Sequence, residues 1–378
     1  MIFTVFDVET NGLRKKVSKI HCLSYQIYDN NKFVSKGTIT DLEKMKLFLS
    51  IQDNLVGHNI VKYDVPVIEQ ILGLSISQKL IDTLSISWYL FPNRKKHGLQ
   101  SWGYQYNYPK PPIDDWEELP LEEYINRCEV DVEINSRLFL ETYEYLLRIY
   151  DTMSATNDFI SYLTFKMDCL KEQEEVGITL NEPLAISHAE TLEKEFIDKT
   201  NILSAIMPKD LGTVIKTKPK NMFKQDGTVS VLGQKWLDYL TEHKLPMTTQ
   251  IVQNLPNPGS DVQLKTWLFR LGWKPETFKV SKSEGNKGEK IPQVSLPFGA
   301  GICKSVKVLY EKEPNLVELE GYFKTKHRIG VFESYLKNLE DGKVVASAHG
   351  FTNTLRLTHS KPVKFHCGFK TALIAGNS

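Results

Sequence analysis

The first thirteen residues constrain the fold of this chain more than any other stretch. Residues 2–8 are rich in β-branched and aromatic side chains, and the turn dipeptide Asn11-Gly12 follows shortly after them, a pattern typical of a strand that ends in a turn. Asp7 and Glu9 are two residues apart, so on a strand their side chains share one face. Neighbouring carboxylates repel each other unless a cation lies between them. The pair favours a divalent metal, although a solvent-facing Asp-x-Glu on an edge strand fits the triplet equally well.

The segments that follow alternate between strand patterns and helix patterns. Strands are expected where apolar and polar residues alternate, and helices where apolar residues recur every three or four positions. The expected strands are 19–28, 32–40 and 54–57, and the expected helices are 41–50, 96–106 and 121–147. The sequence therefore predicts an α/β fold through about Tyr150, in which the first strands form an antiparallel meander.

Two further carboxylates complete a candidate metal site. Asp64 stands where a short strand meets a helix, and Asp131 lies on the part of the long helix that is expected to pack on the sheet. Together with the first two acids they can surround one pocket. Carboxylate oxygens are hard ligands that suit Mg²⁺ or Mn²⁺, and two such ions roughly 3.5–4 Å apart can activate a water and stabilise a leaving oxygen. This set predicts metal-assisted hydrolysis of a phosphodiester.

Five segments resemble a known family in their order and spacing: FDVETNGL, HNIVKYDVP, IDTLSISWYL, HGLQSWGYQ and RCEVDVEIN. They are similar to the motifs of the DEDD-type 3′→5′ proofreading exonucleases, which have a ribonuclease H-like fold, in the form found in family A DNA polymerases of short-tailed bacteriophages. The resemblance implies that the four acids are catalytic and bind two ions, Mg²⁺ or Mn²⁺. It also implies that Thr10 and Leu13 contact the 3′-terminal nucleotide and that Asn59 lines the single-strand groove.

One position departs from the pattern of this family. The family usually places a Tyr four residues before the last Asp, or a His five before it, to orient the attacking water, whereas this chain has Arg127 and Asn126 there. Tyr124 lies two helical turns before Asp131, so it can take this role only if the helix is shifted. Arg127 could instead steer the scissile phosphate. The departure leaves a weakened exonuclease open, while the four retained acids favour an active one.

The second half resembles the beginning of a family A polymerase body. Its paired helices fit that body and also any helical hairpin. Residues 207–307 contain 16 Lys and Arg against 8 Asp and Glu, a surplus that suits DNA phosphates or a solvated lysine-rich face. The helix within 257–275 is similar to part of the phage polymerase thumb, where Ser260 and Lys265 would contact phosphates.

The string TLRLTHSKP resembles the segment that leads into the polymerase palm. By this resemblance, Arg356, Thr358, His359 and Lys361 contact the primer and template. Residues 365–378 contain no acid and do not resemble the expected palm and fingers, which we therefore expect on a second chain. The expected domains are 1–150, an exonuclease domain; 151–364, a mainly helical thumb-like DNA-binding region; and 365–378, a tail.

The expected function is a metal-dependent 3′→5′ exodeoxyribonuclease that proofreads DNA replication as the N-terminal portion of a split or truncated polymerase. Its expected partners are a single-stranded DNA 3′ end, a primer-template duplex and the second chain, without which no polymerase activity is expected. The alternatives are a non-catalytic DNA-binding scaffold and, less favoured, an RNA exonuclease. Scattered cysteines and the lack of a leader or an apolar stretch near 18 residues predict the cytosol of a bacterial or phage-infected host, without membrane attachment.

Overall fold

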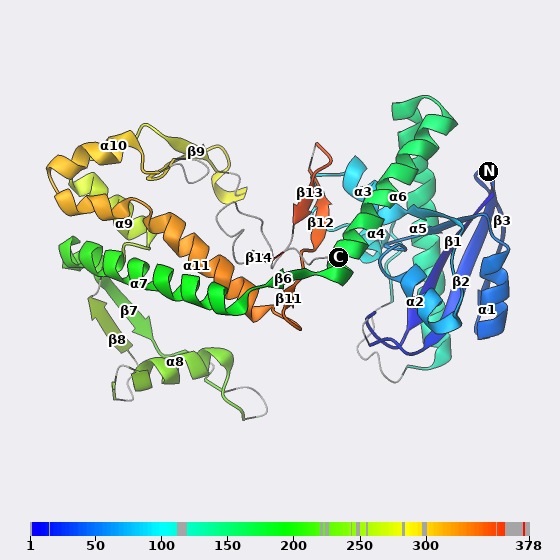
Figure 1. The fold of residues 1–378 in the computed structure, drawn as a ribbon, viewed down its shortest axis with the longest axis horizontal. Coiled ribbons are helices and arrows are strands. Elements are labelled where there is room, and N and C mark those ends of the chain that lie inside the picture. The colour runs from blue at the N-terminus through cyan, green and yellow to red at the C-terminus, as the bar shows by residue number, and fades with distance from the viewer. Residues whose placement is uncertain are drawn as a thin grey trace. The chain divides into compact units, whose positions relative to one another are not determined.

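The chain folds into two compact units in the computed structural model drawn in Figure 1. Unit 1 comprises Met1–Leu180 and Asn338–Ser378, and unit 2 comprises Asn181–Lys337. The structure describes residues 2–14, 16–111, 119–219, 222–223, 227–242, 244–246, 250–254, 256–281, 284–296, 301–352, 354–359 and 373–374. Within these ranges, no helix combines the length and the apolar character that crossing a lipid bilayer requires.

A five-stranded mixed sheet forms the centre of unit 1. Its order is β3-β2-β1-β4-β5, with antiparallel pairing from β1 to β3 and parallel pairing from β1 to β5. The strands are β1 (Ile2–Thr10), β2 (Ile20–Asp29), β3 (Lys32–Ile39), β4 (Asn54–Gly57) and β5 (Lys79–Asp82). Because β1 is central and largely buried, its sequence is a nearly continuous apolar run.

Six helices accompany this sheet in the first 180 residues that the structure describes. They are α1 (Leu42–Ser50), α2 (Asp64–Leu72), α3 (Thr83–Leu90), α4 (Leu99–Gln105), α5 (Leu121–Tyr150) and α6 (Met153–Val176). The apolar face of α5 packs on β1 and β2, and the Phe139 ring meets Phe3 edge-on, with 4.9 Å between ring centroids. Helix α6 packs on α5 and β5, and its Ile160 and Leu163 join the same core.

The last part of the chain returns to unit 1. Strand β6 (Ile178–Leu180) pairs with both β11 (Lys343–Val344) and β14 (Leu373–Ile374). Strands β12 (Ala348–Phe351) and β13 (Leu357–His359) form a hairpin. The Phe351 ring of this hairpin meets Trp88 of α3 at 5.5 Å, nearly perpendicular, so aromatic packing ties the hairpin to the sheet layer.

Unit 2 is mainly helical. Its helices are α7 (Glu182–Ile206), α8 (Val231–Glu242), α9 (Asp261–Arg270), α10 (Lys304–Lys307) and α11 (Tyr322–Lys337). Among its described residues, short strands form two antiparallel pairs: β7 (Thr213–Thr217) with β8 (Gln250–Asn254), and β9 (Phe278–Val280) with β10 (Lys290–Pro292). The long helices α7 and α11 pack together, with Phe196 stacked on Tyr322 at 4.8 Å.

The predicted fold class is confirmed. The strands expected at 19–28, 32–40 and 54–57 correspond to β2, β3 and β4, and the mixed sheet with flanking helices agrees with a ribonuclease H-like fold. A mainly helical region follows, as expected. The polar break at 151–157 suggests a limit near Tyr150, but α6 packs with the sheet. The domain limits drawn from the sequence therefore stay a prediction.

Candidate metal centre

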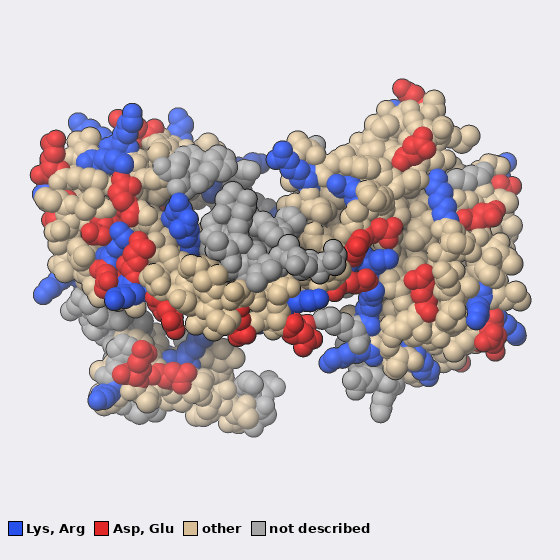
Figure 2. Space-filling model, in the orientation of Figure 1, with Lys and Arg blue, Asp and Glu red and all other residues tan. Residues whose placement is uncertain are grey.

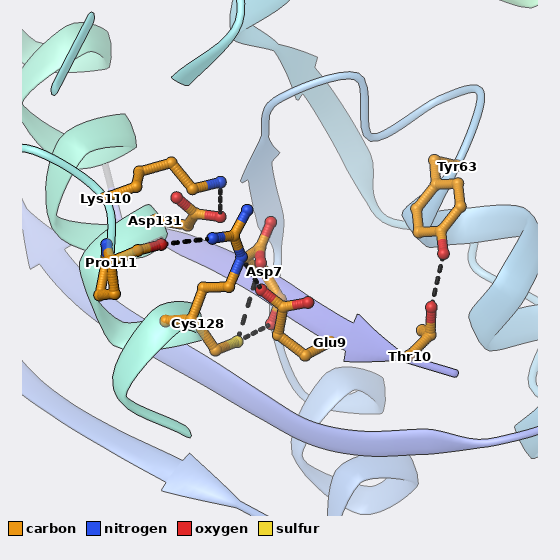
Figure 3. Close-up of polar contacts among 9 residues, drawn as sticks. Asp7, Glu9, Thr10, Tyr63, Lys110, Pro111, Cys128 and Asp131 are labelled. Carbon is orange, nitrogen blue, oxygen red and sulfur yellow. Dashed lines mark hydrogen bonds and ion pairs between the residues drawn. The ribbon is translucent and has the colours of Figure 1, made fainter. Parts of the chain in front are cut away.

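Three carboxylates meet where β1 passes beneath α5 (Figure 3). The ligand atoms of Asp7, Glu9 and Asp131 all lie within 4.8 Å of one another. Asp7 and Glu9 leave β1 on the same face, as their spacing predicts, and they lie beyond Val5, the last residue of β1 that pairs with β4. Asp131 is a buried residue on the face of α5 that packs on the sheet. The three acids form what we call the acid cluster.

Asp64, the fourth predicted acid, lies close enough to interact electrostatically with the acid cluster. It is the first residue of α2 and is buried. Burial is the largest cause of the raised pKa values of Asp7 and Asp64, and the charge of Asp64 adds to the shift at Asp7 while the charge of Glu9 adds to the shift at Asp64. The structure therefore brings all four predicted acids into one electrostatic environment, with Asp64 outside the set of closest ligand atoms.

Burial of these acids strongly disfavours their charged forms. Burial, followed by the charges of its neighbours, raises the pKa of Asp7 well above its usual range. Burial and the charge of Asp131 raise the pKa of Glu9 to about 7, although Arg127 and Lys110 oppose the shift. Burial raises the pKa of Asp64 to about 8. Such crowded, desolvated carboxylates bind either protons or a cation.

The donor set fits a divalent metal. Asp131 Oδ1 is buried and has no hydrogen-bond partner among the described residues. A buried carboxylate oxygen without a partner is costly, and a cation among the three acids would satisfy it. Because all the donors are carboxylate oxygens, the site suits Mg²⁺ or Mn²⁺ rather than a soft metal.

Two basic side chains enter the acid cluster. The ammonium group of Lys110 pairs with Asp131 Oδ2. Arg127 Nε lies 3.3 Å from Glu9 Oε1, and its Nη1 donates a hydrogen bond to the Pro111 carbonyl at 2.8 Å. Arg127, which stands at the position usual for the family Tyr, therefore faces the acids. The sequence pattern does not single out Lys110, because Tyr-Pro-Lys-Pro matches none of the motifs.

Thr10 lies beside the acid cluster and contacts Tyr63, the residue that precedes Asp64. The Tyr63 hydroxyl lies 2.5 Å from the Thr10 hydroxyl and donates to the Gly12 carbonyl at 2.7 Å, as part of the contact drawn in Figure 3. Leu13 follows with 81% of its surface exposed. This arrangement leaves an apolar side chain in solvent next to the site, where the resemblance implies contact with a terminal nucleotide.

Asn59 and Tyr124 each contact residues outside the acid cluster. Asn59 has a left-handed backbone, with φ 65°, and its N–H donates to Asp82 Oδ1 at 3.2 Å. Tyr124 is buried in a cluster with Cys22 and Cys128, and its ring stacks on His21 at 4.0 Å. The roles that the resemblance implies for Asn59 and Tyr124 stay predictions.

The remaining predicted contacts are distributed over both units. In unit 2, Ser260 caps α9 and Lys265 pairs with Asp261 at 2.7 Å. On the face drawn in Figure 2, basic and acidic side chains are interspersed on both units. The β12–β13 hairpin of unit 1 contains Thr358 and His359, with exposed Arg356 just before β13. Lys361 lies outside the described residues, and all these DNA contacts stay predictions.

Protons and metal should compete for the acid cluster. Because the pKa values of Glu9 and Asp64 are raised to about 7 and about 8, these two acids bind more protons in the metal-free folded state than in the unfolded chain between about pH 4 and 8. Their contribution to the stability therefore falls as the pH rises through that range. We expect Mg²⁺ to raise the thermal midpoint more at pH 8 than at pH 6, measured by differential scanning fluorimetry. An equal effect at both pH values would contradict a site made of these acids.

Comparison with solved structures identifies a likeness over nearly the whole chain. The POL domain of Pol1 from M. smegmatis, in complex with DNA primer-template and dNTP, matches with a TM-score of 0.50 and 13% identity, over 96% of this chain and 51% of that chain. This chain thus spans about half the length of that polymerase domain. At this identity the likeness shows the fold alone.

Two shorter matches each cover less than half of this chain. Brucella melitensis NrnC with bound Mg²⁺ matches with a TM-score of 0.32 and 18% identity, over 43% of this chain and 83% of that chain. Exonuclease X in complex with 5′ overhanging duplex DNA matches with a TM-score of 0.31 and 14% identity, over 42% of this chain and 99% of that chain. The sequence matches no protein-family profile and no curated protein.

Proposed function

We propose that this chain is a metal-dependent 3′→5′ exodeoxyribonuclease that removes mismatched nucleotides for a family A DNA polymerase. The acid cluster supports this proposal most directly, because Asp7, Glu9 and Asp131 offer ligand atoms within 4.8 Å of one another. The five ordered motifs, which contain these acids, and the mixed sheet also support it. The substrate class and the polarity of cleavage come from the motif resemblance.

Asp7, Glu9 and Asp131 would hold a divalent cation, and Asp64 is the fourth predicted ligand of the proposed pair of ions. A bound cation supplies positive charge that makes a water more acidic and offsets the charge developing on the phosphate. Asp7 and Glu9 are fixed by β1, and Asp131 is fixed by α5, so their oxygens stay in place without reorganisation during the reaction. The buried setting strengthens each of these electrostatic interactions.

Thr10, Tyr63 and Leu13 would position the 3′-terminal nucleotide. The hydrogen-bonded pair of Thr10 and Tyr63 fixes the turn at the end of β1, at 2.5 Å between the hydroxyl oxygens. The exposed Leu13 offers an apolar surface on which a base could pack. None of these groups presents a pattern that distinguishes one base from another, so we expect cleavage to favour frayed 3′ ends over particular sequences.

The proposal places this chain within a polymerase. Unit 2 would act as the thumb, with Ser260 and Lys265 on duplex phosphates, and Arg356, Thr358, His359 and Lys361 would contact primer and template. Palm and fingers would come from a second chain or from further residues of the same polypeptide. We expect no extension of a primer by residues 1–378 without them.

Labelled DNA tests the polarity and the substrate of the proposed reaction. With Mg²⁺, a strand labelled at its 5′ end should give a ladder of successively shorter products, faster when its 3′ nucleotide is mismatched, and EDTA should stop the reaction. A strand of RNA should be shortened more slowly. Release of a 5′-terminal label as a mononucleotide in the first turnovers would contradict the 3′→5′ direction.

The two basic side chains in the acid cluster favour one other function. Lys110 and Arg127 neutralise part of its charge in the way that a metal would, which suits a fold kept as a DNA-binding scaffold. A scaffold would bind primer-template DNA in a mobility-shift assay and leave it intact at every Mg²⁺ concentration. DNA shortening that depends on the acids would exclude this alternative.

A further inference from the structure

We propose that Lys110 is an exchangeable counterion: it neutralises Asp131 in the metal-free protein, is released when a divalent cation binds, and then contacts the phosphate being cleaved. This inference rests on the proposed nuclease function. It assigns a substrate-binding role to a residue outside the five motifs. The observation behind it is the ion pair between Lys110 and Asp131, a member of the acid cluster (Figure 3).

Residues 106–111 lie along α5 through successive contacts. The Tyr106 hydroxyl donates to Glu141 at 2.6 Å, and the Arg137 guanidinium lies 5.1 Å from the centroid of the Tyr108 ring. Lys110 then reaches Asp131. Residues 106, 108 and 110 thus contact helix residues of decreasing number, so the chain runs antiparallel to α5 after the turn at residues 106 and 107. The contacts of Tyr106 and Tyr108 with α5 therefore position Lys110 beside the acid cluster.

Arg127 binds the backbone of this segment at Pro111. Its Nη1 donates to the Pro111 carbonyl at 2.8 Å while its Nε lies 3.3 Å from Glu9. One planar guanidinium therefore joins the residue after Lys110 to the acid cluster, and such a fork holds two partners in a defined geometry. Arg127 acts as a positioning residue in this account.

Lys110 is the side chain suited to exchange. Its side chain is 12% exposed, so in this buried position its ammonium needs a negative partner. Its flexible stem ends in a compact charge that can turn between partners, whereas Tyr106 and Tyr108 can keep the backbone in place. A cation ligated by Asp131 would repel the ammonium and leave the phosphate as the nearest anion.

The contact would stabilise the charge that develops during hydrolysis. Water adds its oxygen to phosphorus as the bond between phosphorus and O3′ breaks. The water gives up one proton and O3′ takes up one, so the products are a 5′-mononucleotide and a strand shortened by one residue. Lys110 on a non-bridging oxygen would offset the negative charge of the transition state.

Metal binding and catalysis should respond in opposite directions to loss of this ammonium. We expect Lys110→Met to bind Mn²⁺ about five- to tenfold more tightly than wild type in calorimetric titrations without DNA, because a competitor for Asp131 is removed. The single-turnover rate at saturating Mn²⁺ should fall about 100-fold. Lys110→Arg keeps the positive charge, so its affinity for Mn²⁺ should be closer to that of wild type than the affinity of Lys110→Met is. Lys44 is exposed, and Lys44→Met serves as the matched control, in which the Mn²⁺ affinity and the single-turnover rate should both be unchanged.

The results separate this inference from the proposed function. Wild-type protein that binds Mn²⁺ and shortens DNA, with a Lys110→Met variant of unchanged or weaker metal affinity, would overturn the exchange. An unchanged rate at saturating Mn²⁺ would overturn the phosphate contact. Wild-type protein that does neither would instead overturn the nuclease proposal.

A measurement on the wild-type chain covers the case in which the variant does not fold. Amine labelling followed by mass spectrometry should modify Lys110 faster with Mg²⁺ than without it, relative to Lys44 in the same sample. Equal or slower labelling with Mg²⁺ would overturn release of Lys110 from Asp131.

Discussion

The double substitution Asp7→Asn/Glu9→Gln is expected to lower the single-turnover rate of DNA shortening by about a thousandfold or more, because it removes two of the three carboxylates of the acid cluster. Both replacements keep the shape of the side chain. The same change should raise the thermal midpoint at pH 8 in the absence of metal. Burial raises the pKa values of both carboxyl groups because it disfavours their charged forms, and the substitutions remove those charges. Loss of activity together with gain of stability is the expected signature of a functional site.

A matched control separates this effect from a general loss of charge. Glu122→Gln/Glu123→Gln removes two acids from exposed positions at the start of α5, and it should change the rate by less than about twofold. A double variant in the acid cluster that cleaves DNA as fast as this control would contradict the assignment of the site. A less stable cluster variant would indicate that the acids have a structural role.

Phe139→Ala is expected to destabilise unit 1 by about 3–5 kcal/mol, measured by urea unfolding. Phe139 is fully buried and packs edge-on against Phe3 at 4.9 Å, so its removal leaves a cavity between α5 and β1. These are the two elements that carry the acid cluster. The affinity for Mn²⁺ should therefore fall in the same variant, because Asp131 is held less firmly.

Phe165→Ala provides the control for this second prediction. Phe165 lies on α6 in the same unit and is 61% exposed, so its loss should cost less than about 1 kcal/mol and leave metal binding unchanged. Equal destabilisation by both substitutions would show that packing of α5 on β1 is not what stabilises the unit.

Local patterns predicted the core of the fold and the positions of three acids of the candidate site. The apolar run of residues 2–8 predicts β1, and period-2 spacing then places Asp7 and Glu9 on one face, where the structure has them. The helical stripe of α5 predicts that Asp131 faces the sheet. Each of these inferences depends on a short repeat within a single element, which is where sequence carries most information.

Features set by long-range contacts could not be read from local patterns. The pairing of β6 with β11 brings residues after Asn338 back to unit 1, and no local repeat encodes such a pairing. Lys110 lies in an irregular segment, so its approach to Asp131 depends on the docking of residues 106–111 on α5. Arg127 was visible as a departure from the family pattern, but its partner Glu9 is 118 positions away in the sequence.

The most direct test of the metal centre is the position of Mn²⁺ in crystals of the protein, located from its anomalous scattering. We predict a peak bounded by Asp7, Glu9 and Asp131, absent from crystals of Asp7→Asn/Glu9→Gln. A peak at another set of residues, or no peak in wild-type crystals at millimolar Mn²⁺, would contradict the assignment of the acid cluster as a catalytic metal site.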